Sequence, residues 1–296
     1  MKNMETLSDI FRDMDKAANT FFGKYLPEQK GEHMTEKQYN QIPAVRRSDL
    51  ILLRRSPEHL EYAKSLAGHE EPTPAQIFGT AMHAAILEPE RFNQEYAVAP
   101  LVDKRTKAGK EEWAAFVAEN EGKTVISRED YDQIFAMKIQ LMKSDKVLEL
   151  LHGEHEKTYV WKDEETGEEC KIRLDCLTKW DGRPVIVDYK TVSSCEDGVF
   201  ERECRRYGYK IQAGMYTEGL AVATDFMTDA GFMFICQEKT PPYAVRIYQC
   251  DPGFIEQGNR QFHELLRYYH QCRESGEWPG YADGYLCADQ FEEVAE

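Results

Sequence analysis

The most constraining feature of the sequence is a run of three β-rich segments in the middle of the chain. Residues 156–163, 168–180 and 184–191 are rich in Val, Ile, Thr, Tyr and Trp. Turn signals separate them, Thr166-Gly167 first and Asp181-Gly182 second. The pattern predicts a three-stranded meander.

Helical patterns lie on both sides of this meander. One runs from Ser48 to about Ala67 with a break at Ser56-Pro57, and another opens at Thr73-Pro74, where threonine caps a helix and proline suits its first turn. Further helices are expected at about 110–119, 127–143, 205–224 and 251–275, and further strands near 231–238 and 243–249. This order predicts an α/β or α+β class with a mixed sheet.

The chain divides into three expected parts. Residues 1–35 form a helical extension, in which Leu7, Ile10 and Phe11 recur at helical spacing. Residues 36–276 form the main domain, and residues 277–296 form an acidic tail.

Composition narrows the class of protein. No apolar run approaches the roughly 20 residues of a membrane span, and the N-terminus is acidic and amphipathic, so we expect a cytoplasmic protein. The eight cysteines include no C-x-x-C pair, which disfavours a zinc ribbon or a disulfide framework and leaves an iron–sulfur cluster as a minor alternative. The net charge of −16 excludes general electrostatic coating of nucleic acid, so any DNA contact depends on local basic clusters.

The second hairpin of the meander carries the candidate chemistry. Asp188 and Lys190 share one face of a strand. If Asp181-Gly182 is a two-residue turn, Asp175 lies opposite Asp188, where two carboxylates repel each other unless a divalent cation binds both. A longer loop through Pro184 would instead leave two solvated aspartates.

The first hairpin offers a third acid. A turn centred on Thr166-Gly167 pairs Thr158 with Asp175 and puts Glu156 diagonal to it, as a ligand of a second metal, a group that holds water, or a solvated side chain. Two aspartates, a metal and Lys190 suit phosphodiester hydrolysis, with the lysine orienting or deprotonating water or stabilising the charge on phosphorus.

Four motifs in order resemble the RecB-type branch of the PDDEXK nucleases. They are Gly79-x-x-x-His83, Asp175 after Ile172-Arg173-Leu174, Asp188-Tyr189-Lys190, and Gln212-x-x-x-Tyr216. The stretches SDLILLRRSPEHLEYAK, FGTAMHAAILEPERF and DKRTKAGKEEW are similar to the nuclease domain of exonuclease VIII (RecE). The resemblance covers residues 36 to about 270.

The resemblance implies a central mixed sheet flanked by helices and a Mg²⁺-dependent exonuclease, with Mn²⁺ able to substitute and one or two ions per site. It implies digestion of linear duplex DNA from the 5′ end, which leaves 3′ overhangs for a RecT-like single-strand annealing protein in phage-type recombination. It further implies a homo-oligomeric ring and a phage or prophage origin.

Site residues carry over from the motifs. His83, Asp175 and Asp188 would bind metal with the backbone carbonyl of Tyr189, and Lys190 would serve the nucleophilic water. Gln212 and Tyr216, on one helix face, would brace the site or touch DNA. Many PDDEXK enzymes have glutamate where this chain has Asp188, but the RecB-type branch accepts aspartate.

Local basic residues are the candidates for DNA contact. The expected loop 101–110 carries four of them, Lys104, Arg105, Lys107 and Lys110. They contact DNA phosphates, as the resemblance of this loop to the nuclease domain implies, or they are simply solvated. Arg173 shares the face of Asp175 and reaches the scissile phosphate or pairs with the acids. The alternative functions are a Cas4-like trimming nuclease and a catalytically silent DNA-end scaffold.

Overall fold

The computed structural model describes residues 34–66, 72–224 and 229–283. The predicted extension over residues 1–35 and the tail over 277–296 therefore lie largely outside the described residues.

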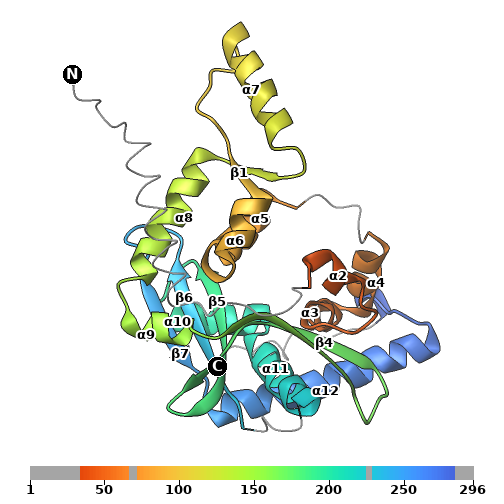
Figure 1. Cartoon of the computed structure of the whole chain (residues 1–296). Coiled ribbons are helices and arrows are strands. Elements are labelled where there is room, and N and C mark those ends of the chain that lie inside the picture. Colours follow the sequence, from red (N-terminus) through yellow and green to blue (C-terminus); the bar gives the residue numbers. More distant parts are fainter. Residues whose placement is uncertain (1–33, 67–71, 225–228, 284–296) are drawn as a thin grey trace.

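A five-stranded mixed sheet forms the centre of the molecule (Figure 1). Its strands are β3 (Glu154–Lys162), β4 (Glu169–Trp180), β5 (Arg183–Val192), β6 (Gly231–Glu238) and β7 (Val245–Gln249), in that spatial order. All neighbours are antiparallel except β5 and β6, which are parallel. The predicted meander is β3–β4–β5, and the two later predicted strands are β6 and β7.

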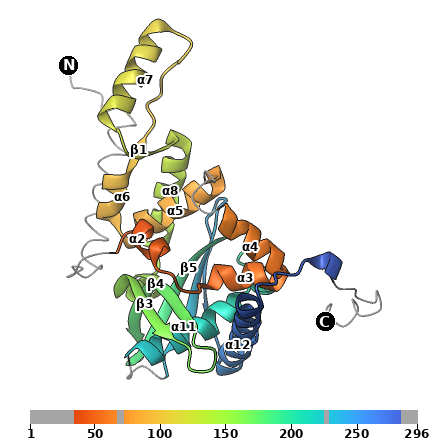
Figure 2. The same ribbon diagram turned by 90° about the vertical axis from the view of Figure 1, so that its right-hand side faces the viewer.

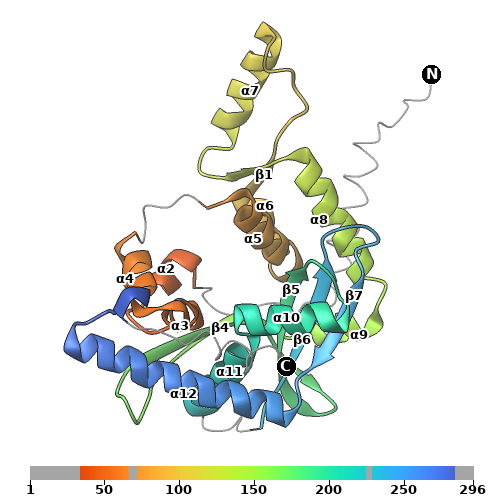
Figure 3. The ribbon, with the colours of Figure 1, turned by 180° about the vertical axis from the view of Figure 1, so that it is seen from behind.

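Helices cover both faces of this sheet (Figures 1 and 3). One face packs against α3 (Arg47–Arg55), α4 (Pro57–Ser65), α10 (Asp197–Tyr207), α11 (Tyr209–Thr224) and α12 (Pro252–Ser275). The other packs against α5 (Pro74–Leu87), α6 (Pro89–Glu95), α8 (Arg128–Leu141) and α9 (Asp145–Leu150). Alternation along β5 serves both cores, because Ile186 lies in the first and Val187 in the second. The fold is α/β, as predicted.

Local signals explain where several helices begin and end. Thr73 caps α5 and Pro74 lies in its first turn, as expected from the sequence, and the structure adds a reciprocal capping box between Thr73 and Gln76. The predicted single helix over 205–224 is wrong. Gly208 adopts a left-handed conformation (φ 65°) that ends α10, and α11 begins at the next residue.

Two glycines let α11 and α12 approach closely. A Cβ atom on Gly258 would lie 1.8 Å from the carbonyl oxygen of Lys210, and one on Gly214 would lie 2.1 Å from the backbone nitrogen of Asn259. Neither position tolerates a side chain without separation of the two helices.

A helical arm projects from the body (Figure 2). It contains α7 (Lys107–Glu119), and β1 (Tyr96–Val98) and β2 (Thr124–Ile126) pair in parallel at its base. The helix begins at Lys107, three residues earlier than predicted, because Thr106 accepts a hydrogen bond from Gly109 as its cap. The sequence did not predict β1 and β2, since three residues are too few to show a period.

Two short helices complete the described chain, α2 (Glu36–Gln41) and the 3₁₀ turn η1 (Tyr281–Asp283). Among the described residues, none of the helices combines the length and apolar character needed to cross a membrane.

Candidate metal centre

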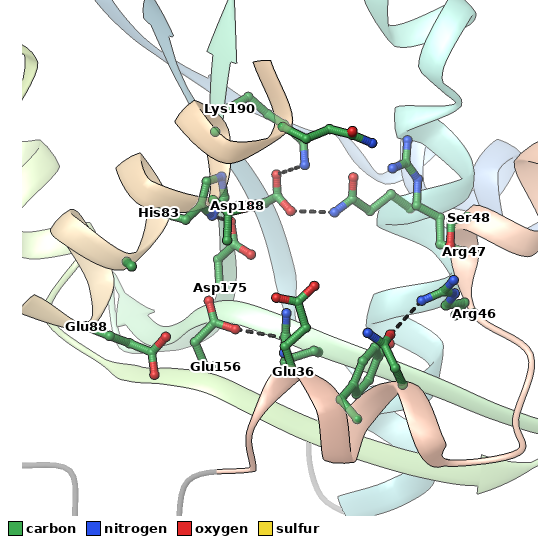
Figure 4. A pocket seen from close by; sticks show the side chains of 18 of the residues that line it. Glu36, Arg46, Arg47, Ser48, His83, Glu88, Glu156, Asp175, Asp188 and Lys190 are labelled. Carbon is green, nitrogen blue, oxygen red and sulfur yellow. Dashed lines mark hydrogen bonds and ion pairs between the residues drawn. The ribbon is translucent and has the colours of Figure 1, made fainter. Parts of the chain in front are cut away.

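A cleft of about 450 Å³ opens where β3, β4 and β5 meet α2, α3, α5 and α11 (Figure 4). All seven side chains predicted to be catalytic line it: His83, Glu156, Asp175, Asp188, Lys190, Gln212 and Tyr216. The structure therefore brings together residues that are up to 133 positions apart in the chain (83 to 216).

Asp188 is the most enclosed acid of the cleft, with 2% of its surface exposed. Lys190 Nζ lies 2.6 Å from its Oδ2 (Figure 4). Gln212 Nε2 donates a hydrogen bond to its Oδ1. Burial raises the pKa of Asp188, and the negative charge of Asp175 raises it further, while Lys190 acts in the opposite direction. The carboxylate thus depends on positive charge beside it.

Asp175 occupies a distortion of β4. The predicted register is confirmed from Trp180↔Arg183 to Cys176↔Val187. The ladder ends at Cys176, so it does not reach the neighbouring Asp175. Leu174 and Cys176 are two apart yet pack on opposite faces of the sheet, so the alternation breaks at Asp175. Its carboxylate is thereby turned toward β5.

The backbone of β5 holds this carboxylate in place. Tyr189 N donates a 2.9 Å hydrogen bond to Asp175 Oδ2. The side chain of Tyr189 is fully buried and donates to Gln237 Oε1 at 2.6 Å. The backbone of Tyr189 therefore lies beside the acids, and its role as a carbonyl ligand stays a prediction.

The predicted position of Glu156 is wrong in register. The structure pairs Thr158 with Arg173, not with Asp175, so Glu156 faces Asp175 across the hairpin between two flanking ladder pairs. The turn signal misled because Thr166-Gly167 lies near the end of a longer loop, in which Asp163 Oδ1 accepts hydrogen bonds from the backbone nitrogen and hydroxyl of Thr166.

Facing Asp175 has an electrostatic consequence for Glu156. Burial and the charge of Asp175 raise its pKa to about 8, although Arg173 Nε lies 2.9 Å from its Oε2. Its backbone is left-handed (φ 51°), an unusual conformation for glutamate.

His83 reaches the acids from α5. Its Nδ1 lies 3.6 Å from Asp175 Oδ2, longer than a hydrogen bond, and its ring makes an edge contact with Tyr189. His83, Glu156 and Asp175 place one donor atom each within 4.8 Å of one another.

This donor set fits a divalent cation. Imidazole nitrogen and carboxylate oxygens are ligands of first-row metals and Mg²⁺. Asp188, which is buried, and Glu156, which is partly buried, both have raised pKa values, and a bound cation would lower them. Gln212 Oε1 is buried beside them without a hydrogen-bond partner among the described residues.

The predicted DNA-contacting residues fall into two places. Arg173 lines the cleft. Lys104, Arg105, Lys107 and Lys110 lie on the arm, outside the cleft lining, and the last two are in α7 rather than in a loop. Part of this charge is already engaged, since Arg105 pairs with Asp103 at 2.9 Å and Lys104 Nζ lies 3.0 Å from the centre of the Trp113 ring.

Sequence reasoning missed one wall of the cleft. It is built by α2, the start of α3 and the junction of α5 and α6: Glu36, Tyr39, Arg46, Arg47, Ser48, Glu88 and Arg91. The sequence signal that could have located this wall was the basic pair Arg46-Arg47 at the start of a helix.

The cysteines that the structure describes form no candidate cluster site. Within the described ranges, the residue groups able to hold a metal contain histidine, aspartate and glutamate but no cysteine. An iron–sulfur cluster, and with it the Cas4-like alternative, gains no support.

Comparison with known proteins agrees with this architecture. A family model described as a PDDEXK-like domain of unknown function (DUF3799) matches residues 47–290. The crystal structure of a "Putative exonuclease" from Eubacterium rectale superposes with a TM-score of 0.58 at 15% identity, over 87% of this chain and 92% of that one. SSO0001 aligns over 86% of both chains at 12% identity, but its TM-score of 0.33 supports no argument. The search of curated proteins gave no match.

Proposed function

The chain belongs to the family of PDDEXK-like domains of unknown function, and we propose that it is a metal-dependent deoxyribonuclease. The observation that carries the proposal is the cleft in which Asp188, Asp175 and Lys190 meet His83. A histidine, two aspartates and a lysine at a cleft are the groups that metal-assisted phosphodiester hydrolysis requires.

In this proposal His83, Asp175, Asp188 and the carbonyl of Tyr189 hold Mg²⁺, which Mn²⁺ can replace, and Glu156 holds a second ion or a water. When bound, the cation would polarise a phosphoryl oxygen and lower the pKa of a water.

The remaining residues position the reactants. Lys190, 2.6 Å from Asp188, orients or deprotonates the attacking water. Gln212 donates a hydrogen bond to the second oxygen of Asp188 and so fixes the orientation of that carboxylate. Arg173 sits beside Glu156 at the cleft wall, where it can meet a phosphate.

The proposed substrate is the end of linear duplex DNA, cut from 5′ to 3′ to leave 3′ overhangs. Its support is the order of the four motifs, which resemble the RecB-type branch, the longer stretches that resemble exonuclease VIII, and the name of the E. rectale structural neighbour. A RecT-like annealing partner, a ring-shaped homo-oligomer and a cytoplasmic role in phage-type recombination belong to the same proposal. The arm residues Lys104, Arg105, Lys107 and Lys110 would grip the duplex backbone.

The test is digestion of 5′-phosphorylated linear duplex DNA with Mg²⁺, beside an Asp188→Ala variant and an EDTA control. We expect mononucleotides from the wild type alone, and end-specific labels give the polarity. Binding to DNA ends without product in Mg²⁺ or Mn²⁺ would favour the silent scaffold. An active Asp188→Ala variant would contradict the site assignment.

A further inference from the structure

A second group of potential ligands lies outside the cleft, where the turn after β3 meets α11 and α12. Asp163, Glu218 and His263 place one donor atom each within 4.8 Å of one another, from three separate elements. The close packing of α11 on α12 brings Glu218 and His263 together (Figure 3).

Glu218 fixes the imidazole of His263. Its Oε2 lies 2.9 Å from His263 Nε2 and also accepts a hydrogen bond from Asn259 Nδ2. A metal-binding histidine commonly donates its other ring N–H to a carboxylate in this way, which sets the tautomer and leaves the second nitrogen as an acceptor. Here the second nitrogen is Nδ1.

Nδ1 faces an oxygen that lacks a hydrogen bond. The Asp163 side chain is only 5% exposed, and its Oδ1 accepts two hydrogen bonds from Thr166, but its Oδ2 accepts none from the described residues. His263 Nδ1 lies 3.7 Å from that Oδ2. This separation is too long for a hydrogen bond.

The same separation suits two ligands of one metal ion. Ligands at zinc distances of about 2.0–2.2 Å, arranged tetrahedrally, stand roughly 3.4 Å apart. A neutral imidazole has one N–H, so His263 cannot donate to both carboxylates. With the N–H of His263 on Nε2, Asp163 Oδ2 receives no hydrogen bond from this imidazole, and a cation between Oδ2 and Nδ1 would bind both.

We propose that Asp163 Oδ2 and His263 Nδ1 bind a divalent transition-metal ion, with Zn²⁺ the best fit, and that Glu218 orients the imidazole. Mixed nitrogen and oxygen donors favour zinc over Mg²⁺ or Ca²⁺. The ion would fasten the β3–β4 turn to α12. This inference does not depend on the proposed nuclease activity.

Zinc content and thermal stability of the full chain test the site. The protein is dialysed against ZnCl₂ with excess Mg²⁺ to occupy the cleft, freed of loose metal and analysed for bound zinc, and its Tm is measured with and without one equivalent of ZnCl₂. We expect His263→Gln to lose one zinc per chain and the zinc-dependent rise in Tm. In EDTA the variant and the wild type should melt alike.

His270→Gln is the matched control. His270 lies on the same helix and also meets a buried carboxylate, but its Nδ1 is 2.8 Å from Glu168 Oε1, an ordinary hydrogen bond. We expect it to keep the zinc. If His263→Gln fails to fold, Asp163→Asn replaces it, since Oδ1 can still accept from Thr166.

Equal zinc content with and without His263 would overturn the inference, as would a wild-type chain that retains no zinc. Either result would identify the cluster as a hydrogen-bonded histidine between two acids.

Discussion

Two histidine–aspartate pairs have almost the same nitrogen–oxygen separation, and their aspartates lie at different points of the β3–β4 hairpin. His83 Nδ1 is 3.6 Å from Asp175 Oδ2, and His263 Nδ1 is 3.7 Å from Asp163 Oδ2. Their surroundings differ. The first pair opens into a cleft that also holds Lys190, whereas the second is packed between a turn and two helices.

The difference shows that a ligand pair alone does not specify a reaction. Around the first pair, the acids Asp188 and Glu156 have raised pKa values because they are largely desolvated. Lys190 lies 2.6 Å from Asp188, where it can transfer a proton or stabilise negative charge. Around the second, Thr166 donates to the other oxygen of Asp163, and Asn259 donates to the oxygen of Glu218 that also faces His263. The first arrangement suits catalysis and the second suits structure.

The largest expected effect separates the two histidines. We predict that His83→Ala lowers DNA hydrolysis at least about 10²-fold, because loss of even an outer partner of a metal costs 10–100-fold. His263→Gln should leave the rate within about twofold. Initial rates at saturating Mg²⁺ give both values. Similar losses in the two variants would erase the distinction between a catalytic and a structural pair.

The next effect concerns pH and the metal-free cleft. The pKa of Glu156 rises from 4.5 to about 8 on folding, so the folded protein holds a proton that the unfolded chain has lost. The free energy of unfolding in EDTA should therefore fall as pH rises from about 4.5 to 8, by up to a few kcal/mol. Glu156→Gln should flatten this fall.

Urea unfolding at several pH values measures it. Glu154→Gln is the control, since Glu154 lies on the same strand with 62% of its side chain exposed and should keep the wild-type slope. Identical slopes for wild type and Glu156→Gln would show that Glu156 ionises normally in the fold.

The smallest expected effect separates DNA binding by the arm from the reaction at the cleft. We predict that Lys104→Ala with Lys110→Ala weakens duplex binding about tenfold and lowers the slope of log K against log salt by about 2. The cleft should remain intact, so the maximal rate should hold. Fluorescence anisotropy across a salt series measures the slope.

Lys146→Ala, exposed on α9, is the matched control for charge loss. An unchanged salt slope in the arm variant would mean that α7 does not touch the phosphate backbone.

Much of the fold and of the cleft was predictable because the signals were local. Richness in Val, Ile, Thr, Tyr and Trp, together with the turn signals, located β3, β4 and β5, and the Asp181-Gly182 turn gave the register that sets Asp175 near Asp188. The Thr73-Pro74 pair located the start of the helix that carries His83.

The failures at the site share a physical reason, which is that single side-chain hydrogen bonds decided them. The register of Glu156 depends on the side chain of Asp163, which lengthens the first turn, and the break of alternation at Asp175 depends on its bond from Tyr189. Neither leaves a periodic trace in the sequence. The zinc cluster joins a turn to α11 and α12, so no sequence spacing announces it.

The central claim is that the acids of the cleft hold a divalent cation. Crystals soaked in Mn²⁺, with anomalous data collected at the manganese absorption edge, test this claim most directly. The account predicts an anomalous peak bounded by His83, Asp175 and Asp188, which disappears in Asp188→Ala crystals soaked in the same way. An empty cleft in fully soaked wild-type crystals would contradict it.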